Sequence, residues 1–466
     1  MERLSGLDST FLYSETPSLH MHTLKIAVLE PDAYSFERFR SAMLRTIPRL
    51  PGFRRRLVEI PWSLGHPIWI EDPDLDIDAH ISRRVIPAPG DQVELCKIIS
   101  EVAGTGLDRS RPLWQIVVVE GLTRGRIAVI CKLHHCVADG SAAYEMLIEV
   151  ALQHGGPDSP ESSYEAPPKE APPSRADLLR LALSAFLTRL AHLPLLLWKT
   201  LTGGIRVLRR MIGQKSKVPN LFVVPVTSFN KALTPNRTFA TATLPLSEIL
   251  EVKRQLGVTL NDVILTICGG ALRQYLGQRR ELPERSLVAS VPTNTRQDET
   301  RRLSGNKVGN LMTTLGTNIA DPIARALSIH EVLQEAKEIQ AALGHDILED
   351  WAEFAPPGPY SSISALWSRF GLASHLPPPT NMIVSNVRGP SEYLEILGGR
   401  LDEFYSVGPI LEGIGLNITA WSYAGRVSFS MIACPEHVPD PWKLMACLSD
   451  ALDELRQSLA ERSPVP

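Results

Sequence analysis

The sequence predicts an α/β protein built from two similar domains. Each half of the chain alternates amphipathic helical patterns with short apolar runs typical of strands. Between the halves lies a stretch rich in Pro, Ser and Glu, residues 155–174, which has no hydrophobic period. It cannot bury enough apolar surface to offset chain entropy, so we expect an exposed linker. With 466 residues and 44% hydrophobic content, the chain is long enough for more than one core.

The first predicted domain covers residues 1–154. RFRSAMLRTIPRL and VELCKIISEVAGTGL have the spacing of amphipathic helices, and WQIVVVEGLTRGRIAVICKLHH reads as two apolar strands joined by a Gly-containing turn. Residues 127–133 are almost continuously apolar, as expected of a strand covered on both faces. Residues 141–154 then have helical spacing, with Gly155 as a stop signal.

The second predicted domain covers residues 221–466. TFATATLPL, SLVASVP and NMIVSNV are strand-like, whereas NDVILTICGGALRQYL and residues 323–343 are helical in pattern. GLNITAWSYAGRVSFSMIA predicts a hairpin that turns at Tyr423-Ala424-Gly425, and a last helix is expected over 443–459. Because the two halves have a similar make-up, we expect similar domains that meet at a cleft, where sites often form.

Composition excludes several classes of protein. The 48 Lys and Arg nearly cancel the 51 Asp and Glu, so the chain as a whole has no charge that would attract nucleic acid. The six cysteines lie in apolar stretches without metal-ligand spacing, which indicates reduced core residues of a cytoplasmic protein and no metal. The N-terminus does not resemble a secretory signal. No run of 18 uncharged apolar residues occurs, so we expect no membrane-spanning helix.

The clearest chemical motif is HHCVADG, residues 134–140, between the buried strand and the helix. Histidine suits a general base near neutral pH, because its ordinary pKa is about 6.5. Neighbours at a strand end point to opposite sides, so only one of His134 and His135 can face a substrate. Asp139 would fix the loop by pairing, with Arg296 as candidate partner, or orient the histidine ring; Gly140 would allow a tight turn. In the structural alternative, His134 and His135 simply end a strand and Asp139 caps the following helix. That alternative leaves the histidine pair unexplained.

HHCVADG matches the HHxxxDG signature of the CoA-dependent acyltransferase superfamily. Six further blocks resemble, in order, those of the bacterial wax ester synthase/diacylglycerol acyltransferase family. They are LSGLDSTFLYSETPSLHMH, RPLW, LNDVILTICGGALRQYL, GNKVGNLM, SNVRGP and GPILEGIGLNITAWSYAGRVSFSMIACP. The resemblance extends over nearly the whole chain.

This resemblance implies two chloramphenicol-acetyltransferase-like domains with a tunnel at their interface. It further implies transfer of a long-chain acyl group from acyl-CoA to diacylglycerol, giving triacylglycerol, or to a long-chain alcohol, giving a wax ester. His135 would take the hydroxyl proton, within a motif of His134, His135, Asp139 and Gly140. No cofactor is expected, because acyl-CoA is itself a substrate. The alternatives are a condensation-type enzyme with a carrier-protein-bound acyl donor, and a non-catalytic protein that coats lipid surfaces.

Four further residues are candidates for substrate binding, and the first three each have a structural alternative. Trp114, in RPLW, would line the acyl tunnel or belong to the core. Asn261 would stabilise the oxyanion or, with Asp262, cap the following helix. Asn386, in NVRGP, would lie near the cleft or end a strand before a tight turn. Glu15 follows an apolar segment that, by crossing the tunnel, would bring it to the acceptor.

The segment 175–220 is basic and apolar at once. Residues 176–217 contain eight Lys or Arg and one acid, Asp177, with breaks at Pro194 and Gly203-Gly204. Charges recur too often for a membrane span, yet the background is too apolar for a solvated helix. We therefore expect one or two basic amphipathic helices at a membrane or lipid-droplet surface, and a cytoplasmic, peripherally associated protein. The alternative is an interdomain helix packed on the core.

Overall fold

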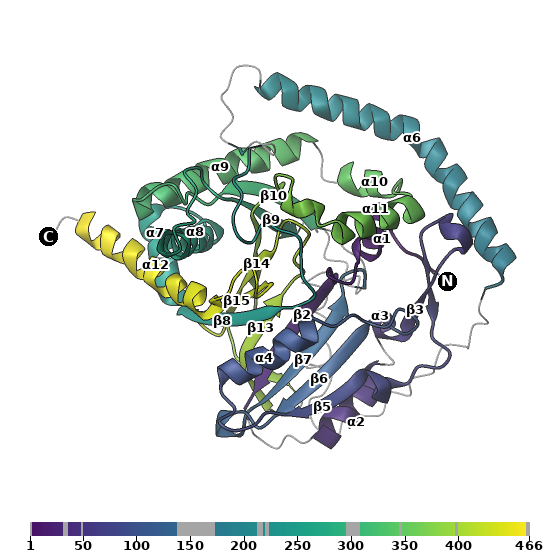
Figure 1. The fold of residues 1–466 in the computed structure, drawn as a ribbon, viewed down its shortest axis with the longest axis horizontal. Coiled ribbons are helices and arrows are strands. Elements are labelled where there is room, and N and C mark those ends of the chain that lie inside the picture. The colour runs from purple at the N-terminus through teal and green to yellow at the C-terminus, as the bar shows by residue number, and fades with distance from the viewer. Residues whose placement is uncertain are drawn as a thin grey trace.

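The structure is a computed structural model that describes residues 2–30, 36–47, 50–137, 173–211, 218–219, 223–294, 308–343, 347–396 and 399–462. Three parts of the prediction lie outside these residues: the helix expected over 141–154, most of the linker 155–174, and residues 138–140 of the loop that follows the histidine pair. The described chain forms two six-stranded sheets and one three-stranded sheet with helices around them (Figure 1).

The first six-stranded sheet carries the histidine motif. In spatial order its strands are β12 (Glu395–Ile396), β13 (Gly399–Val407), β2 (His22–Leu29), β7 (Ile127–His134), β6 (Trp114–Glu120) and β5 (Ile81–Val85). Helix α2 (Phe36–Thr46) covers one face through Phe39 and Met43, and α4 (Gln92–Ala103) covers the other through Leu95 and Ile99. All eight residues of β7 are buried, which confirms the strand expected to be covered on both faces.

The second six-stranded sheet contains most of the C-terminal half. Its strands in order are β10 (Val308–Thr314), β9 (Val288–Asn294), β11 (Met382–Arg388), β14 (Leu416–Tyr423), β15 (Arg426–Ala433) and β8 (Thr238–Pro245). The helices that contribute to its core are α7 (Leu246–Leu256), α8 (Leu260–Gln278), α9 (Pro322–Leu343) and α12 (Pro441–Arg462). The predicted hairpin is confirmed. Its turn residues Ala424 and Gly425 both have positive φ, a backbone that favours glycine at the second position.

The two predicted domains exchange chain segments. Strand β13 pairs with β2 over six residue pairs, so the sheet of the N-terminal domain is completed by chain from the predicted domain 221–466. In return, the edge strand β8 contacts α4, where the Phe239 amide donates to Ser100 Oγ at 2.9 Å. The domains are therefore interlocked rather than divided at residue 220.

A small sheet and several short helices lie at one end of the first domain. The sheet contains β1 (Glu2–Arg3), β4 (Ile68–Glu71) and β3 (Arg55–Val58). The helices are α1 (Gly6–Ser14), α3 (Pro51–Arg54), α10 (Ile347–Ala352) and α11 (Pro357–Arg369), with short 3₁₀ turns η2 (Pro61–Ser63), η3 (Ile77–His80), η4 (Thr123–Gly125) and η5 (Leu372–Ser374). Helix α1 contacts both α10 and α11, so chain from both halves meets here.

The basic stretch forms one helix, α6 (Arg175–Met211), of 37 residues. It continues through Pro194, Gly203 and Gly204, which the sequence marks as breaks. Figure 1 shows it running along the outside of the molecule, past α10 and toward the end that holds the small sheet.

Candidate active site

The histidine pair lies where strand β7 ends. His134 is its last residue and pairs in register with His22, the first residue of β2. The His134 amide donates to Leu113 O at 3.0 Å, and the His135 amide donates to Met21 O at 2.7 Å. His134 is completely buried, whereas His135 is partly exposed. This difference fits the expectation that only one of the two histidines faces a substrate.

A single carboxylate joins the ends of both strands. Glu15, at the C-terminus of α1, accepts a hydrogen bond from the Met21 amide through Oε1 at 3.0 Å. The same oxygen lies 3.3 Å from Nε2 of both His22 and His134. Its Oε2 atom accepts from Arg109 Nη2 at 2.8 Å. Both carboxylate oxygens are therefore engaged inside the protein.

The backbone fixes the tautomer of His134. The Cys136 amide donates to His134 Nδ1 at 3.1 Å, so Nδ1 must present its lone pair and Nε2 carries the proton toward Glu15. Burial alone would raise the pKa of the Glu15 carboxyl, but the contacts from His134 and His22 outweigh it and lower that pKa below its ordinary value. Burial lowers the pKa of His22 to about 3, which keeps its ring neutral at physiological pH.

Glu15, His22 and His134 also have the residue types of a metal site, and their ligand atoms lie within 4.8 Å of one another. The tautomer argues against a metal here. A metal ligand must offer a lone pair, whereas Nε2 of His134 holds a proton because the Cys136 amide already occupies Nδ1. The three residues fit a cluster of close polar contacts, held by the hydrogen bonds of Met21 and Arg109 to Glu15, that anchors the strand ends.

Helix α1 also contacts the partly exposed histidine. The rings of Phe11 and His135 have centroids 4.4 Å apart and are tilted by 45°. One nine-residue helix therefore places Phe11 against His135 and Glu15 against His134. Three residues of this arrangement were absent from the predicted site: His22, Arg109 and Phe11. The signal for His22 was present in the block LHMH, since that histidine begins an apolar strand much as His134 ends one.

Comparison with known proteins agrees with this geometry. The family model described as the wax ester synthase/diacylglycerol acyltransferase catalytic domain matches residues 4–264, and the WS/DGAT C-terminal domain matches residues 304–456. The chain belongs to this family. Two proteins of Mycobacterium tuberculosis strain H37Rv, named as candidate diacylglycerol O-acyltransferases, are 35% and 36% identical to it. The matches cover 98% of the chain, with 90% of the first relative and 96% of the second.

Solved structures support the same fold. The wax ester synthase/diacylglycerol acyltransferase of Marinobacter aquaeolei VT8 superposes with a TM-score of 0.68 at 24% identity, over 99% of this chain and all of that one. The first condensation domain of the calcium-dependent antibiotic synthetase gives 0.59 at 15% identity, over 99% of this chain and 96% of that one. The protein is an acyl-CoA-dependent acyltransferase with two chloramphenicol-acetyltransferase-like domains, and the carrier-protein and non-catalytic alternatives are not favoured.

The other predicted site residues of this WS/DGAT protein lie in several places. Trp114 begins β6 and is 1% exposed. Its indole Nε1 donates to Phe53 O at 2.8 Å, and its ring stacks on His80 with centroids 4.3 Å apart. These contacts belong to the core of the first domain, as the structural alternative for Trp114 expects.

Asn261 and Asn386 meet in the second domain. Nδ2 of Asn386, on β11, lies 3.4 Å from Oδ1 of Asn261, on α8. Of the expected capping pair Asn261-Asp262, only Asp262 takes part. Thr259 is the N-cap, and its Oγ1 accepts from the Asp262 amide at 3.2 Å while Asp262 Oδ2 accepts from the Thr259 amide at 2.8 Å. A Thr–x–x–Asp box satisfies both amides without Asn261.

Three predicted residues, Asp139, Gly140 and Arg296, lie outside the described residues. The pairing of Asp139 with Arg296 and the tunnel between the domains stay predictions. All six cysteines are free and buried, which confirms that they are core residues.

Proposed function

We propose that the protein esterifies diacylglycerol with the long-chain acyl group of acyl-CoA, and that long-chain alcohols are a second class of acceptor. The reaction takes place at a membrane or lipid-droplet surface facing the cytoplasm. Two observations support the proposal: relatives 35–36% identical over 98% of the chain are named as candidate diacylglycerol O-acyltransferases, and α6 presents a long apolar surface to the outside.

In the proposed mechanism His135 is the general base. Its Nε2 atom takes the proton of the acceptor hydroxyl while that oxygen attacks the thioester carbonyl carbon. The tetrahedral intermediate collapses, the C–S bond breaks, and the CoA sulfur leaves with the proton held by His135. A positioned base of this kind contributes about 10²–10⁴-fold. The reaction needs no cofactor, because the thioester is already activated.

The outer face of α6 is the observation that carries the surface location. Large apolar side chains recur along it at intervals of three and four residues, as on one side of a helix. Each is more than half exposed: Leu183, Phe186, Leu187, Leu190, Leu195, Leu197, Trp198 and Leu201. Such a continuous apolar surface is costly in water and is typical of a helix that lies in a membrane interface.

The inner face of α6 is attached to the protein along most of its length. Leu178 and Ala182 pack in a cluster with strand β4. Further along, Arg189 Nη1 donates to Glu353 O at 2.7 Å, and Lys199 Nζ lies 3.1 Å from Asp350 Oδ2. A helix held to a folded domain over this length cannot cross a bilayer while these contacts persist.

By length and composition alone, α6 does reach the hydropathy of a membrane span, with a mean hydropathy of 1.5 in its most apolar window. Helices α7 and α8 together also meet that test, although α8 is the buried core helix of the second domain. Because α6 is attached on one side and apolar on the other, we propose that it lies flat in the interface.

A competition assay tests the acceptor. Purified protein receives palmitoyl-CoA with diacylglycerol and hexadecanol together, and mass spectrometry measures both products. We expect triacylglycerol to exceed wax ester. Wax ester as the main product would overturn the acceptor preference, and no product from free palmitoyl-CoA would overturn the choice of acyl donor.

Vesicle flotation tests the surface location. Leu190→Glu with Trp198→Glu places two charges on the outer face of α6, while Val85→Glu with Leu250→Glu places the same charges on exposed apolar residues of β5 and α7. We expect only the α6 variant to stop floating with anionic vesicles and to lose activity on dispersed diacylglycerol, with activity on a short soluble alcohol retained. Equal flotation of both variants would refute the docking face.

A further inference from the structure

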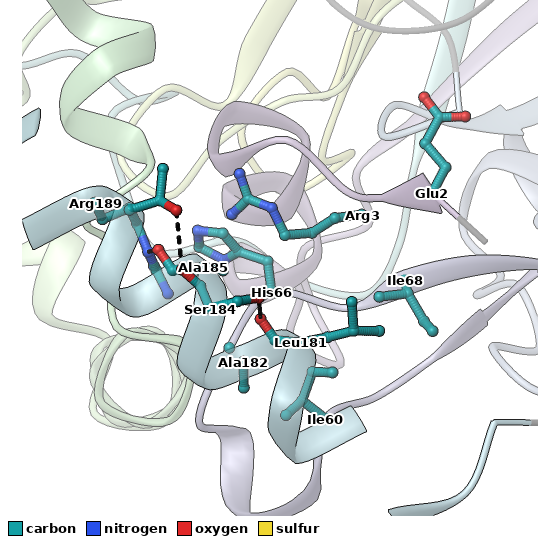
Figure 2. Close-up of a pocket in the computed structure, with 12 residues that line it drawn as sticks. Glu2, Arg3, Ile60, His66, Ile68, Leu181, Ala182, Ser184, Ala185 and Arg189 are labelled. Atoms are coloured by element: carbon teal, nitrogen blue, oxygen red, sulfur yellow. Dashed lines mark hydrogen bonds between the residues drawn. The ribbon is translucent and has the colours of Figure 1, made fainter. Parts of the chain in front are cut away.

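A cavity of about 310 Å³ lies between α6 and the small sheet. One part of its lining is apolar, with Ile60, Ile68 and Leu181, and another part holds Arg3, Arg189 and His66. Figure 2 shows the side chains of Arg3 and Arg189 next to the His66 ring, with Ile60 and Ile68 on the other side of the cavity. This division into a cationic end and an apolar end is suited to an amphiphile.

The cationic end has more positive than negative charge. Arg3 is balanced, because its Nη2 lies 2.7 Å from Glu353 Oε2. Arg189 is half-buried and donates only to two carbonyl oxygens, Glu353 O at 2.7 Å and Ala185 O at 3.3 Å. Among the residues that the structure describes, no carboxylate forms an ion pair with it. Glu2, which also lines the cavity, pairs with Arg55 at 2.7 Å.

A half-buried guanidinium without a carboxylate partner gains from an anion. Burial and the neighbouring Arg3 charge lower the pKa of Arg189, and a bound carboxylate or phosphate would offset both effects. Arg is also the side chain that binds carboxylates and phosphates in a fixed, bidentate geometry.

The apolar end of the cavity opens to the outside along α6. Leu181, which lines the cavity, is 42% exposed. A ligand whose head reaches Arg189 can therefore extend its chain past Ile60 and Ile68 or along α6.

We propose that this cavity is a binding site for an anionic amphiphile, with a carboxylate or phosphate head at Arg189 and an alkyl chain between α6 and the small sheet. It is separate from the histidine cluster and needs neither His135 nor the acyl donor.

Photo-crosslinking tests the proposal on the full-length protein, and the positions of the labelled residues distinguish the cavity from the acyl site. The probes share one diazirine-labelled chain and differ in the head: an oleate analogue, a lysophosphatidate analogue and a neutral oleyl alcohol analogue. We expect the acidic probes to label residues 60–68 and 181–189, and the alcohol to label them about tenfold less, as for loss of one charge-assisted hydrogen bond. The stronger of the two acidic probes identifies the head group.

Three variants complete the test. Arg189→Gln removes the cation, and Ala185→Phe fills the cavity without a change of charge. Arg180→Gln is the matched control, because its side chain is on the same helix and 82% exposed. We expect about tenfold less labelling in the first two variants and wild-type labelling in the third. The proposal fails if both of the first two label like the wild type, if the alcohol labels as well as the acids, or if inorganic phosphate competes as well as the acidic amphiphiles.

Discussion

Replacing Glu15 by Gln should uncouple the two strand ends that support the catalytic histidine. The carboxylate accepts from the Met21 amide and from Arg109, and it faces Nε2 of His22 and of His134. An amide offers one acceptor oxygen in place of two, and its NH₂ group would face donors. Breaking such a buried set costs about 3–5 kcal/mol, and we take the lower end because Arg109 is 40% exposed and can be solvated.

This loss corresponds to a melting temperature lower by about 6 °C, at roughly 2 °C per kcal/mol for a chain of this size. Turnover should fall by about 10²-fold, because the His135 amide bonds to Met21 O, on the residue whose own amide Glu15 holds. The KM for palmitoyl-CoA should stay unchanged. Differential scanning fluorimetry and initial rates with palmitoyl-CoA and diacylglycerol measure these quantities.

Glu30→Gln is the control, since Glu30 follows the other end of β2 and pairs with Arg400 at the surface at 3.3 Å. That change should cost no more than about 1 kcal/mol. Wild-type melting of Glu15→Gln together with a raised KM for the acceptor would refute the anchoring role. It would support instead the sequence-based interpretation that Glu15 contacts the substrate.

Three further predictions follow from the same cluster. His135→Ala should lower turnover by about 10²–10⁴-fold with unchanged melting, whereas His134→Ala should lower the melting temperature as well; equal effects on both properties would contradict the assigned roles. Because the pKa of His22 is about 3 in the folded protein and about 6.5 when unfolded, its contribution to stability is complete above pH 6.5 and is lost as pH falls toward 3. Between pH 7.5 and pH 5 the wild type should therefore lose about 2 kcal/mol of unfolding free energy because of His22, and the His22→Gln variant should not show this loss. A variant whose melting temperature depends on pH in the same way as that of the wild type would exclude this. EDTA should leave turnover unchanged, since the His134 tautomer does not suit a metal; inactivation that zinc reverses would overturn that argument.

The parts of the fold that the sequence predicts are those that depend on local pattern. Strand β7, the hairpin of β14 and β15, and helix α8 follow from periodicity and turn chemistry within about 20 residues. Strand β13 completes the first sheet by pairing with β2, more than 370 residues away, and no local pattern specifies that partner. For the same reason the sequence identifies His134 and His135 but not His22, which reaches the site only through its register with His134.

Helix α6 was harder to predict for a different reason. Pro194, Gly203 and Gly204 lower the intrinsic helix propensity, so the sequence favours one or two shorter helices. The structure has a single helix because its contacts with the protein fall on both sides of Pro194, at Arg189 and at Lys199. Tertiary contacts of this kind override propensity, and they also leave the opposite face apolar and exposed.

Helix α1 connects the cluster at the histidines with the cavity under α6. Its Glu15 and Phe11 contact the strand-end histidines, while Tyr13 Oη bonds to His66 Nδ1 at 2.8 Å and the Gly6 amide donates to Glu353 Oε1 at 2.6 Å. The Glu353 carbonyl in turn accepts from both His66 and Arg189. A Cβ atom on Gly6 would lie 2.3 Å from Glu353 N, so the helix start is packed without space for adjustment. An anion that draws Arg189 away from the Glu353 carbonyl would therefore act on the same short helix that positions Glu15, and a change in turnover on amphiphile binding has a physical route through α1.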